Sequence, residues 1–115
     1  MSFKELSVWQ QARDLSVEIY KVTHGNSFSR DFGLRDQMRR AAVSIASNIA
    51  EGDERGSNKD SVRFLYIAKG SLAELETQLD IANKIGYLDI ALMECLNEKC
   101  VMIGKMLGSL IKARS

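Results

Sequence analysis

The sequence predicts an all-α protein, an antiparallel up-down-up-down four-helix bundle that forms a single domain over residues 1–115. The chain has no proline, which favours long uninterrupted helices, and its 45% of hydrophobic residues suffice for one core. Apolar residues recur at steps of three and four, the spacing of one helix face. Four such segments joined by short connections pack as antiparallel neighbours. Glycines at positions 25, 33, 52, 56 and 86 separate the segments.

The first two helices are predicted at about residues 5–24 and about residues 33–53. His24, followed by Gly25 and Asn26, ends the first helix, and we expect its side chain to interact with the helix dipole there. Small residues along the second helix allow another helix to approach closely. The apolar stripe of the first helix consists of Val8, Ala12, Leu15, Ile19 and Val22, and that of the second of Leu34, Met38, Ala42, Ile45 and Ile49.

The third helix is predicted to be capped by Ser57 or Asn58, whose side-chain oxygens can accept hydrogen bonds from the free amides of the first turn. Gly86 ends this helix, and Asp89 caps the fourth, which continues to Lys112. The third helix has the more regular apolar seam, formed by Leu65, Ala68, Leu72, Leu75, Leu79 and Ala82. The fourth helix is expected to bury Leu92, Leu96, Ile103, Leu107 and Leu110.

Charge and hydropathy argue against several classes of protein. Sixteen basic and fifteen acidic residues give a formal net charge of +1, which by itself does not indicate binding to nucleic acid or to an anionic membrane. The sequence has neither a signal-peptide pattern nor an apolar run near the roughly 18 residues of a membrane span, so we expect a cytoplasmic protein without membrane contact. Cys95 and Cys100 do not face each other on a helix and are expected to be free thiols or small apolar residues.

The residue types that carry catalysis are sparse. His24 is the single histidine, and no Cys, Asp or Glu lies at a metal-ligand spacing from it. Residues 52–56 read Gly-Asp-Glu-Arg-Gly, which lacks the ending of a phosphate-binding loop and is interpreted as a turn between helices. We therefore expect no enzyme activity, no catalytic residue, no metal and no cofactor.

A polar stripe follows the apolar face of the second helix, and a similar one follows the third. If the two faces meet, they form a buried polar network that fixes helix register or makes an oligomer contact. The alternative is a ligand or catalytic site built on the carboxylates Glu51 and Glu74. The residues of this stripe are Gln37, Ser44, Asn48, Glu51, Ser71, Glu74 and Gln78.

Basic residues on the second and third helices could form a surface that contacts phosphates. Local pairs at i,i+4, Asp31 with Arg35 and Asp36 with Arg40, are the alternative explanation. Arg39 instead follows Arg35 by four residues, which indicates a counter-charge from elsewhere in the fold, another subunit or a nucleic acid. Few aromatic residues are interleaved, so any binding is expected to be directed at the backbone and to depend on salt. The candidate phosphate contacts are Arg35, Arg39, Arg40, Lys59, Arg63 and Lys69.

Several motifs together resemble the bacterial four-helix bundle proteins encoded within intervening sequences of some 23S rRNA genes. The motifs are Phe3-x-x-Leu6-x-Val-Trp9, residues 32–45 from Phe-Gly-Leu-Arg-Asp-Gln to Ser-Ile, Asn48-Ile-Ala-Glu-Gly52, Gly70-Ser-Leu-Ala-Glu-Leu-Glu76 and Gly86-Tyr-Leu88. The resemblance covers nearly the whole chain. It implies a homopentamer with a central channel and no enzyme activity. The accessory variability proteins of diversity-generating retroelements are similar in fold. Their binding of nucleic acid and of a reverse transcriptase belongs to particular retroelement loci, and no residue of this chain indicates membership of such a locus.

Two hypotheses of function follow. In the first, the protein is a non-catalytic homo-oligomeric scaffold that contacts RNA or DNA through the six basic residues named above. In the second, it is an assembly module for its own copies or another protein and does not bind nucleic acid. The same arginines would then pair with the acidic region of residues 70–98, which holds six acidic residues and one lysine.

Overall fold

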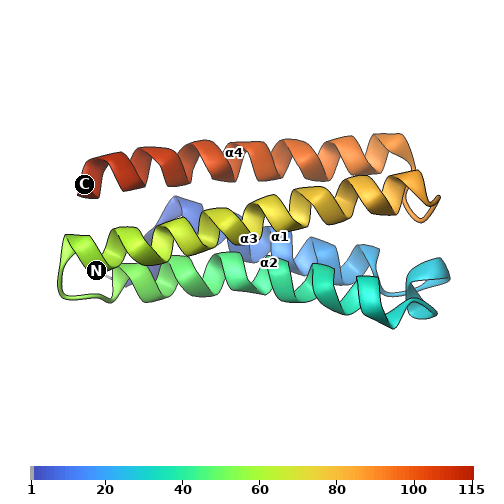
Figure 1. Ribbon diagram of the computed structural model, residues 1–115, viewed down its shortest axis with the longest axis horizontal. Helices are drawn as coiled ribbons and strands as arrows, with labels where there is room; N and C mark the ends of the chain where they lie inside the picture. Colours follow the sequence, from blue (N-terminus) through green and yellow to red (C-terminus); the bar gives the residue numbers. More distant parts are fainter. Residues whose placement is uncertain (1) are drawn as a thin grey trace.

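The computed structural model describes residues 2–115 and contains four long helices (Figure 1). They are α1 (Ser7–Val22), α2 (Phe32–Asp53), α3 (Asn58–Lys84) and α4 (Ile90–Arg114), with two short 3-10 helices at Phe3–Glu5 and Asn26–Ser29. No strand occurs within the described residues, so the all-α four-helix fold class is confirmed. The molecule is elongated, with extents of 44 × 20 × 20 Å.

Contacts between neighbouring helices show how the chain runs. Ser44 of α2 lies beside Ser71 of α3, and Gly52, farther along α2, lies beside Ser61, which comes earlier in α3. The last turn of α4 returns to this same end, where Arg114 contacts Asp53 and Ser61. Successive helices therefore run in opposite directions, as Figure 1 also shows.

Side-chain caps fix three of the helix starts. Asp31, Ser57 and Asp89 each accept a hydrogen bond from a backbone amide in the first turn of α2, α3 and α4. Ser57, rather than Asn58, is therefore the cap of α3. The third helix ends as predicted: Gly86 adopts φ = +86°, a left-handed conformation that glycine takes without steric cost.

The first helix is shorter than the sequence predicts. Its N-terminal turn is separated as the 3-10 helix Phe3–Glu5, and α1 ends at Val22 because Thr23 caps it. The Thr23 hydroxyl donates to the Ile19 carbonyl over 2.7 Å, which satisfies a carbonyl of the last turn. His24 lies beyond this cap and is exposed. The prediction that His24 caps the helix was therefore wrong.

Most residues of the predicted apolar stripes form the core. Val22 and Leu34 are partly buried against it, and the stripe of α4 differs from the prediction. There the buried residues include Cys100, and Leu92 is 37% exposed while Leu110 is partly buried. At 100° per residue, Leu92 and Leu110 both lie about 80° from Cys100 on the same side of the helix. The stripe is thus rotated relative to the prediction, and its buried members are Leu96, Cys100, Ile103, Leu107 and Ile111.

α2 and α3 approach each other closely at Gly52. A Cβ atom at this position would lie 3.0 Å from the Ser61 carbonyl oxygen and 3.3 Å from Cβ of Phe64. A backbone oxygen inside a helix has little freedom to move away. The absent side chain is therefore what allows the two helices to meet at this end of the hairpin.

Polar and aromatic contacts tie both ends of the bundle. At one end, Arg114 donates to Asp53 over 2.7 Å and to Ser61 over 2.8 Å. At the other, the Tyr87 hydroxyl donates to Asp31 over 3.0 Å, and this hydrogen bond raises the pKa of Tyr87 above its usual value. Tyr87 also packs edge-on against the buried ring of Phe28. At each end, these contacts join segments that are distant in sequence.

Replacing Gly52 with alanine is expected to lower the free energy of unfolding by about 1–3 kcal/mol, because the added methyl group overpacks the α2–α3 contact. Gly108→Ala is the matched control, since a Cβ there meets no atom within 4 Å. It should raise stability by up to about 1 kcal/mol through helix propensity. Denaturant unfolding measures both variants, and equal effects would contradict this account of the close contact.

The two thiols are expected to differ in reactivity. Cys95 is exposed, whereas Cys100 is buried, and burial raises the pKa of the Cys100 thiol to about 12. A disulfide-exchange reagent at pH 8 should therefore modify one thiol per native chain and two per chain in denaturant. A Cys95→Ser variant should react slowly until unfolded. Rapid modification of that variant in the native state would contradict the packing of α4.

Candidate nucleic-acid interface

The six candidate phosphate contacts lie in two groups along the α2–α3 hairpin. Arg35, Arg39 and Arg40 occupy the first half of α2, and the other three residues, Lys59, Arg63 and Lys69, occupy the first half of α3. Because Ser44 faces Ser71 and the helices run in opposite directions, these halves point toward opposite ends. At 1.5 Å per residue, Arg39 and Arg63 lie about 20 Å apart along the axis. The structure therefore does not bring all six into one compact patch.

Arg35 does not form the expected pair with Asp31. Its Nε donates to Asp36 over 3.0 Å, and its guanidinium lies 4.6 Å from the centre of the Phe32 ring. Asp31 instead caps α2 and accepts from the Leu34 amide over 3.1 Å. A carboxylate at a helix cap points toward the first-turn amides, which removes it from the i,i+4 pair. The expected Asp36–Arg40 pair is also not formed, because Asp36 is engaged by Arg35.

Arg39 is held by neutral groups. It donates from Nε to the Thr23 hydroxyl over 2.9 Å and from Nη2 to the Thr23 carbonyl over 3.3 Å. Its guanidinium also lies 4.6 Å from the centre of the Tyr20 ring. Within residues 2–115, no carboxylate is within ion-pair distance of Arg39 or Arg40. The positive charge of this region is therefore not neutralised by a direct partner in the chain.

Arginine side chains stack on aromatic rings at several further places on the surface. Arg13 lies 5.2 Å from the centre of the Trp9 ring, and Arg55 and Arg63 lie 4.3 and 5.0 Å from that of Phe64. The weak interleaving of aromatic residues in the sequence did not predict this arrangement. The Trp9–Arg13 spacing of i,i+4 could have indicated one contact, since residues four apart share a helix face.

Part of the predicted polar network exists. The hydroxyl oxygens of Ser44 and Ser71 are 2.9 Å apart, and Nδ2 of Asn48 donates to Oγ of Ser44 over 3.0 Å and to its carbonyl over 2.8 Å. These three residues join α2 to α3 at the middle of the hairpin. The short hydrogen-bonded cluster is consistent with a role in fixing helix register.

The carboxylates of the stripe are not part of this cluster. Glu51 is exposed and accepts from Arg55 over 2.9 Å, and Glu74 is exposed on α3. The two residues lie on opposite sides of the Ser44–Ser71 contact, about 15 Å apart along the bundle axis. They do not form a shared carboxylate site. Within the described residues, no group of three or more His, Cys, Asp or Glu side chains is placed to hold a metal ion.

Gln78 is the unusual member of the polar stripe. It is only 9% exposed, and its Oε1 atom has no hydrogen-bond partner among the described residues. A buried amide oxygen without a donor is costly. Gln78 lies at a shallow depression on the α2–α3 surface, together with Gln37, Gly70, Ala73, Glu74, Thr77 and Ile81.

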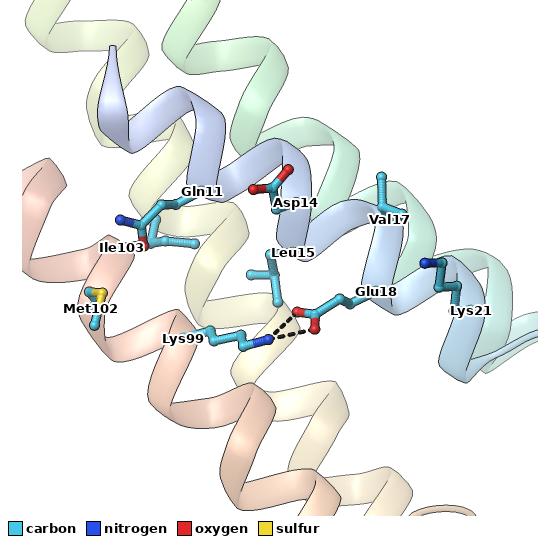
Figure 2. Close-up of a pocket in the computed structure, with 9 residues that line it drawn as sticks. All are labelled: Gln11, Asp14, Leu15, Val17, Glu18, Lys21, Lys99, Met102 and Ile103. Carbon is cyan, nitrogen blue, oxygen red and sulfur yellow. Dashed lines mark hydrogen bonds and ion pairs between the residues drawn. The ribbon is translucent and has the colours of Figure 1, made fainter. Parts of the chain in front are cut away.

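A second depression, between α1 and α4, was not expected from the sequence (Figure 2). Glu18 and Lys99 point toward one another across it, with Nζ 2.6 Å from Oε2. The hydrogen bond to Glu18 raises the pKa of Lys99 above its usual value. Leu15, Ile103 and Met102 add apolar surface to a space of about 620 Å³. The pair is separated by 81 positions, so no local pattern could reveal it.

Comparisons with known proteins agree with this architecture. A crystal structure of a Bacteroides thetaiotaomicron protein from the S23 ribosomal protein family, described as having unknown function, is 28% identical to this chain. The match covers 91% of this chain and 98% of that one, with a TM-score of 0.83. Among curated proteins, no sequence matches the chain.

No helix in the described part of the chain has the length and hydropathy needed to cross a bilayer.

The model of one family, described as 23S rRNA-intervening sequence protein, matches residues 4–109, which is nearly the whole chain. This match agrees with the motifs quoted from the sequence and with the four helices of the structure. The chain therefore belongs to the 23S rRNA-intervening sequence protein family.

Proposed function

We propose that this protein is a non-catalytic, homo-oligomeric scaffold of the cytoplasm that contacts the backbone of RNA or DNA through its basic side chains. The observation that carries the proposal is the environment of Arg39 and Arg40. Neutral groups hold Arg39, and no carboxylate pairs with either residue in the described chain. A phosphate is the type of group that completes such a site, since arginine binds it through charge and directional hydrogen bonds.

The other basic residues extend this contact along the hairpin. Lys59, Arg63 and Lys69 are exposed on α3, and Arg35 lies one turn before Arg39 on α2. A nucleic acid backbone carries charge along its length, so it can bridge groups separated by about 20 Å. The split arrangement thus favours a long polyanion over a small phosphorylated ligand.

The proposed contact between subunits lies on the α2–α3 surface around Gln78. A second copy that supplies a donor to Gln78 Oε1 removes the cost of this buried oxygen. Gly70 and Ala73 allow close approach, and the side chains of Ile67 and Ile81 next to them are 45% and 44% exposed. The family resemblance implies five copies, and we adopt the homopentamer as the expected state.

A pure assembly module is the second candidate function. It is favoured by the same exposed α3 surface, which offers a contact for a protein partner whether or not nucleic acid binds. In that case the acidic region of residues 70–98 supplies the counter-charge for the arginines across a subunit contact, and the protein binds no nucleic acid. The two candidates therefore differ in whether Arg39 and Arg40 face a phosphate or a carboxylate.

Replacing both Arg39 and Arg40 with alanine is expected to weaken binding to structured RNA and to reduce the slope of log affinity against log salt by about two. Each lost phosphate contact releases about one fewer counterion. Lys105→Ala with Lys112→Ala is the matched control, because both lysines are exposed on α4. A slope equal to that of the wild-type protein would remove Arg39 and Arg40 from the interface.

Ile81→Glu is expected to reduce the mass of the assembly measured by light scattering, because the new carboxylate would be buried in the proposed subunit contact. The side chain is 44% exposed in the chain alone, so helix content should not change. Val101→Glu on α4, at 42% exposure, is the control and should keep the wild-type mass. A monomeric wild-type protein, or an unchanged mass for Ile81→Glu, would overturn this interface.

A further inference from the structure

Two neighbouring depressions lie on the surface between α1 and α2. They have volumes of about 380 and 480 Å³ and share Val43 as a common wall. Trp9 lines one depression and Tyr20 lines the other, and the eleven positions that separate them correspond to about 16 Å of helix. We call this surface the α1–α2 groove; its walls are formed mainly by Trp9, Val17, Tyr20, Val43, Ala46 and Arg40.

Each depression combines an aromatic ring with an arginine. The Arg13 guanidinium lies 5.2 Å from the centre of the Trp9 ring, and that of Arg39 lies 4.6 Å from that of Tyr20. Arg39 is further fixed by its two hydrogen bonds to Thr23. A side chain held in place before a ligand arrives loses less conformational entropy on binding. Tyr20 as a residue is nevertheless 45% exposed, so part of its surface remains available for contact.

The charge of the α1–α2 groove is positive at the Tyr20 end. Asp36 also lines this depression, but its carboxylate accepts from Arg35 over 3.0 Å. Arg39 and Arg40 have no carboxylate at ion-pair distance within residues 2–115. At the other end, Arg13 pairs with Asp14, and both side chains are more than half exposed. An exposed pair of this kind is weak and can exchange its partner for a phosphate.

We infer that the α1–α2 groove binds a short single strand of RNA or DNA, with bases against Tyr20 and Trp9 and phosphates at Arg39 and Arg40. The inference rests on the nucleic-acid function proposed above and specifies the form of the ligand. Proteins that bind single strands combine a basic groove with aromatic rings on which the bases stack. Trp9 is partly buried and Tyr20 is exposed, so each ring can offer only part of its surface to a base. A duplex keeps its base faces stacked inside the helix, so it cannot stack a base on either ring or contact the apolar walls at Val17, Val43 and Ala46.

Trp9 provides a direct test, because it is the single tryptophan of the chain. The full-length protein is titrated at low salt with a decamer of thymidylate, a decamer of uridylate and a ten-base-pair DNA duplex. The single strands are expected to quench Trp9 emission in a saturable manner, and the duplex to leave it nearly unchanged. The same titrations followed by a label on the nucleic acid measure affinity independently of the quenching.

Variants of Tyr20 distinguish the contribution of base stacking to the affinity from that of the positive charge. Tyr20→Ala is expected to weaken single-strand binding by about 5- to 150-fold, the range that corresponds to the loss of one base–aromatic stack. Tyr20→Phe keeps the ring and should restore the affinity. Lys105→Ala on α4 is the control for a change outside the groove. Circular dichroism of each variant verifies that the helices are intact.

Three results would overturn the inference, and each has a different consequence for the proposed function. Equal binding of duplex and single strand, unaffected by Tyr20→Ala, would reject the groove but leave the backbone-binding function standing. Failure of all three nucleic acids to bind at low salt would reject both proposals. A Trp9 emission that changes with protein concentration, and not with added single strand, would show that a second copy covers the groove.

Discussion

The close contact between α2 and α3 is the constraint on which the rest of the bundle depends. At Gly52 the two backbones approach until no Cβ fits without displacing the Ser61 carbonyl, and at the centre Ser44 and Ser71 share a hydrogen bond. Small residues and a specific polar pair set both the distance and the register of this hairpin. The positions of the arginines along α2 and of the polar face along α3 then follow, because both are fixed relative to that register.

This register explains why the charged residues of α2 and those of α3 lie far apart along the bundle. An antiparallel hairpin places the early residues of one helix beside the late residues of the next. Basic residues concentrated in the first half of each helix are thus directed to opposite ends, and Glu51 and Glu74 are separated in the same way. Arg39 is held by Thr23 and Tyr20 of the preceding segment rather than by a carboxylate. The surface that results is extended along the bundle axis, as suits a ligand that is itself long.

Much of the fold could be predicted from sequence, because helix periodicity and caps are local properties. The seam of α3, the caps Ser57 and Asp89 and the end at Gly86 follow from residue types within one or two turns. The errors have physical causes. Thr23, and not His24, caps the end of α1, because its hydroxyl can reach a carbonyl of the last turn. Cys100 was left out of the predicted apolar stripe of α4, although its side chain is buried there. The candidate site was harder to predict from the sequence, because its contacts join residues that are far apart along the chain. These contacts are Glu18–Lys99, Arg39–Thr23 and Arg39–Tyr20.

The four seams of the bundle are unequal in a way that bears on how it unfolds. The α2–α3 seam is closed by direct backbone approach, whereas α1 and α4 are bridged by one ion pair above a depression of about 620 Å³. Local opening follows the boundary with the fewest buried apolar contacts. We therefore expect local opening to begin between α1 and α4, with the central hairpin as the more persistent folding unit. The surface that we propose for self-association lies on that hairpin. Subunit contacts would therefore be retained while α1 and α4 separate locally.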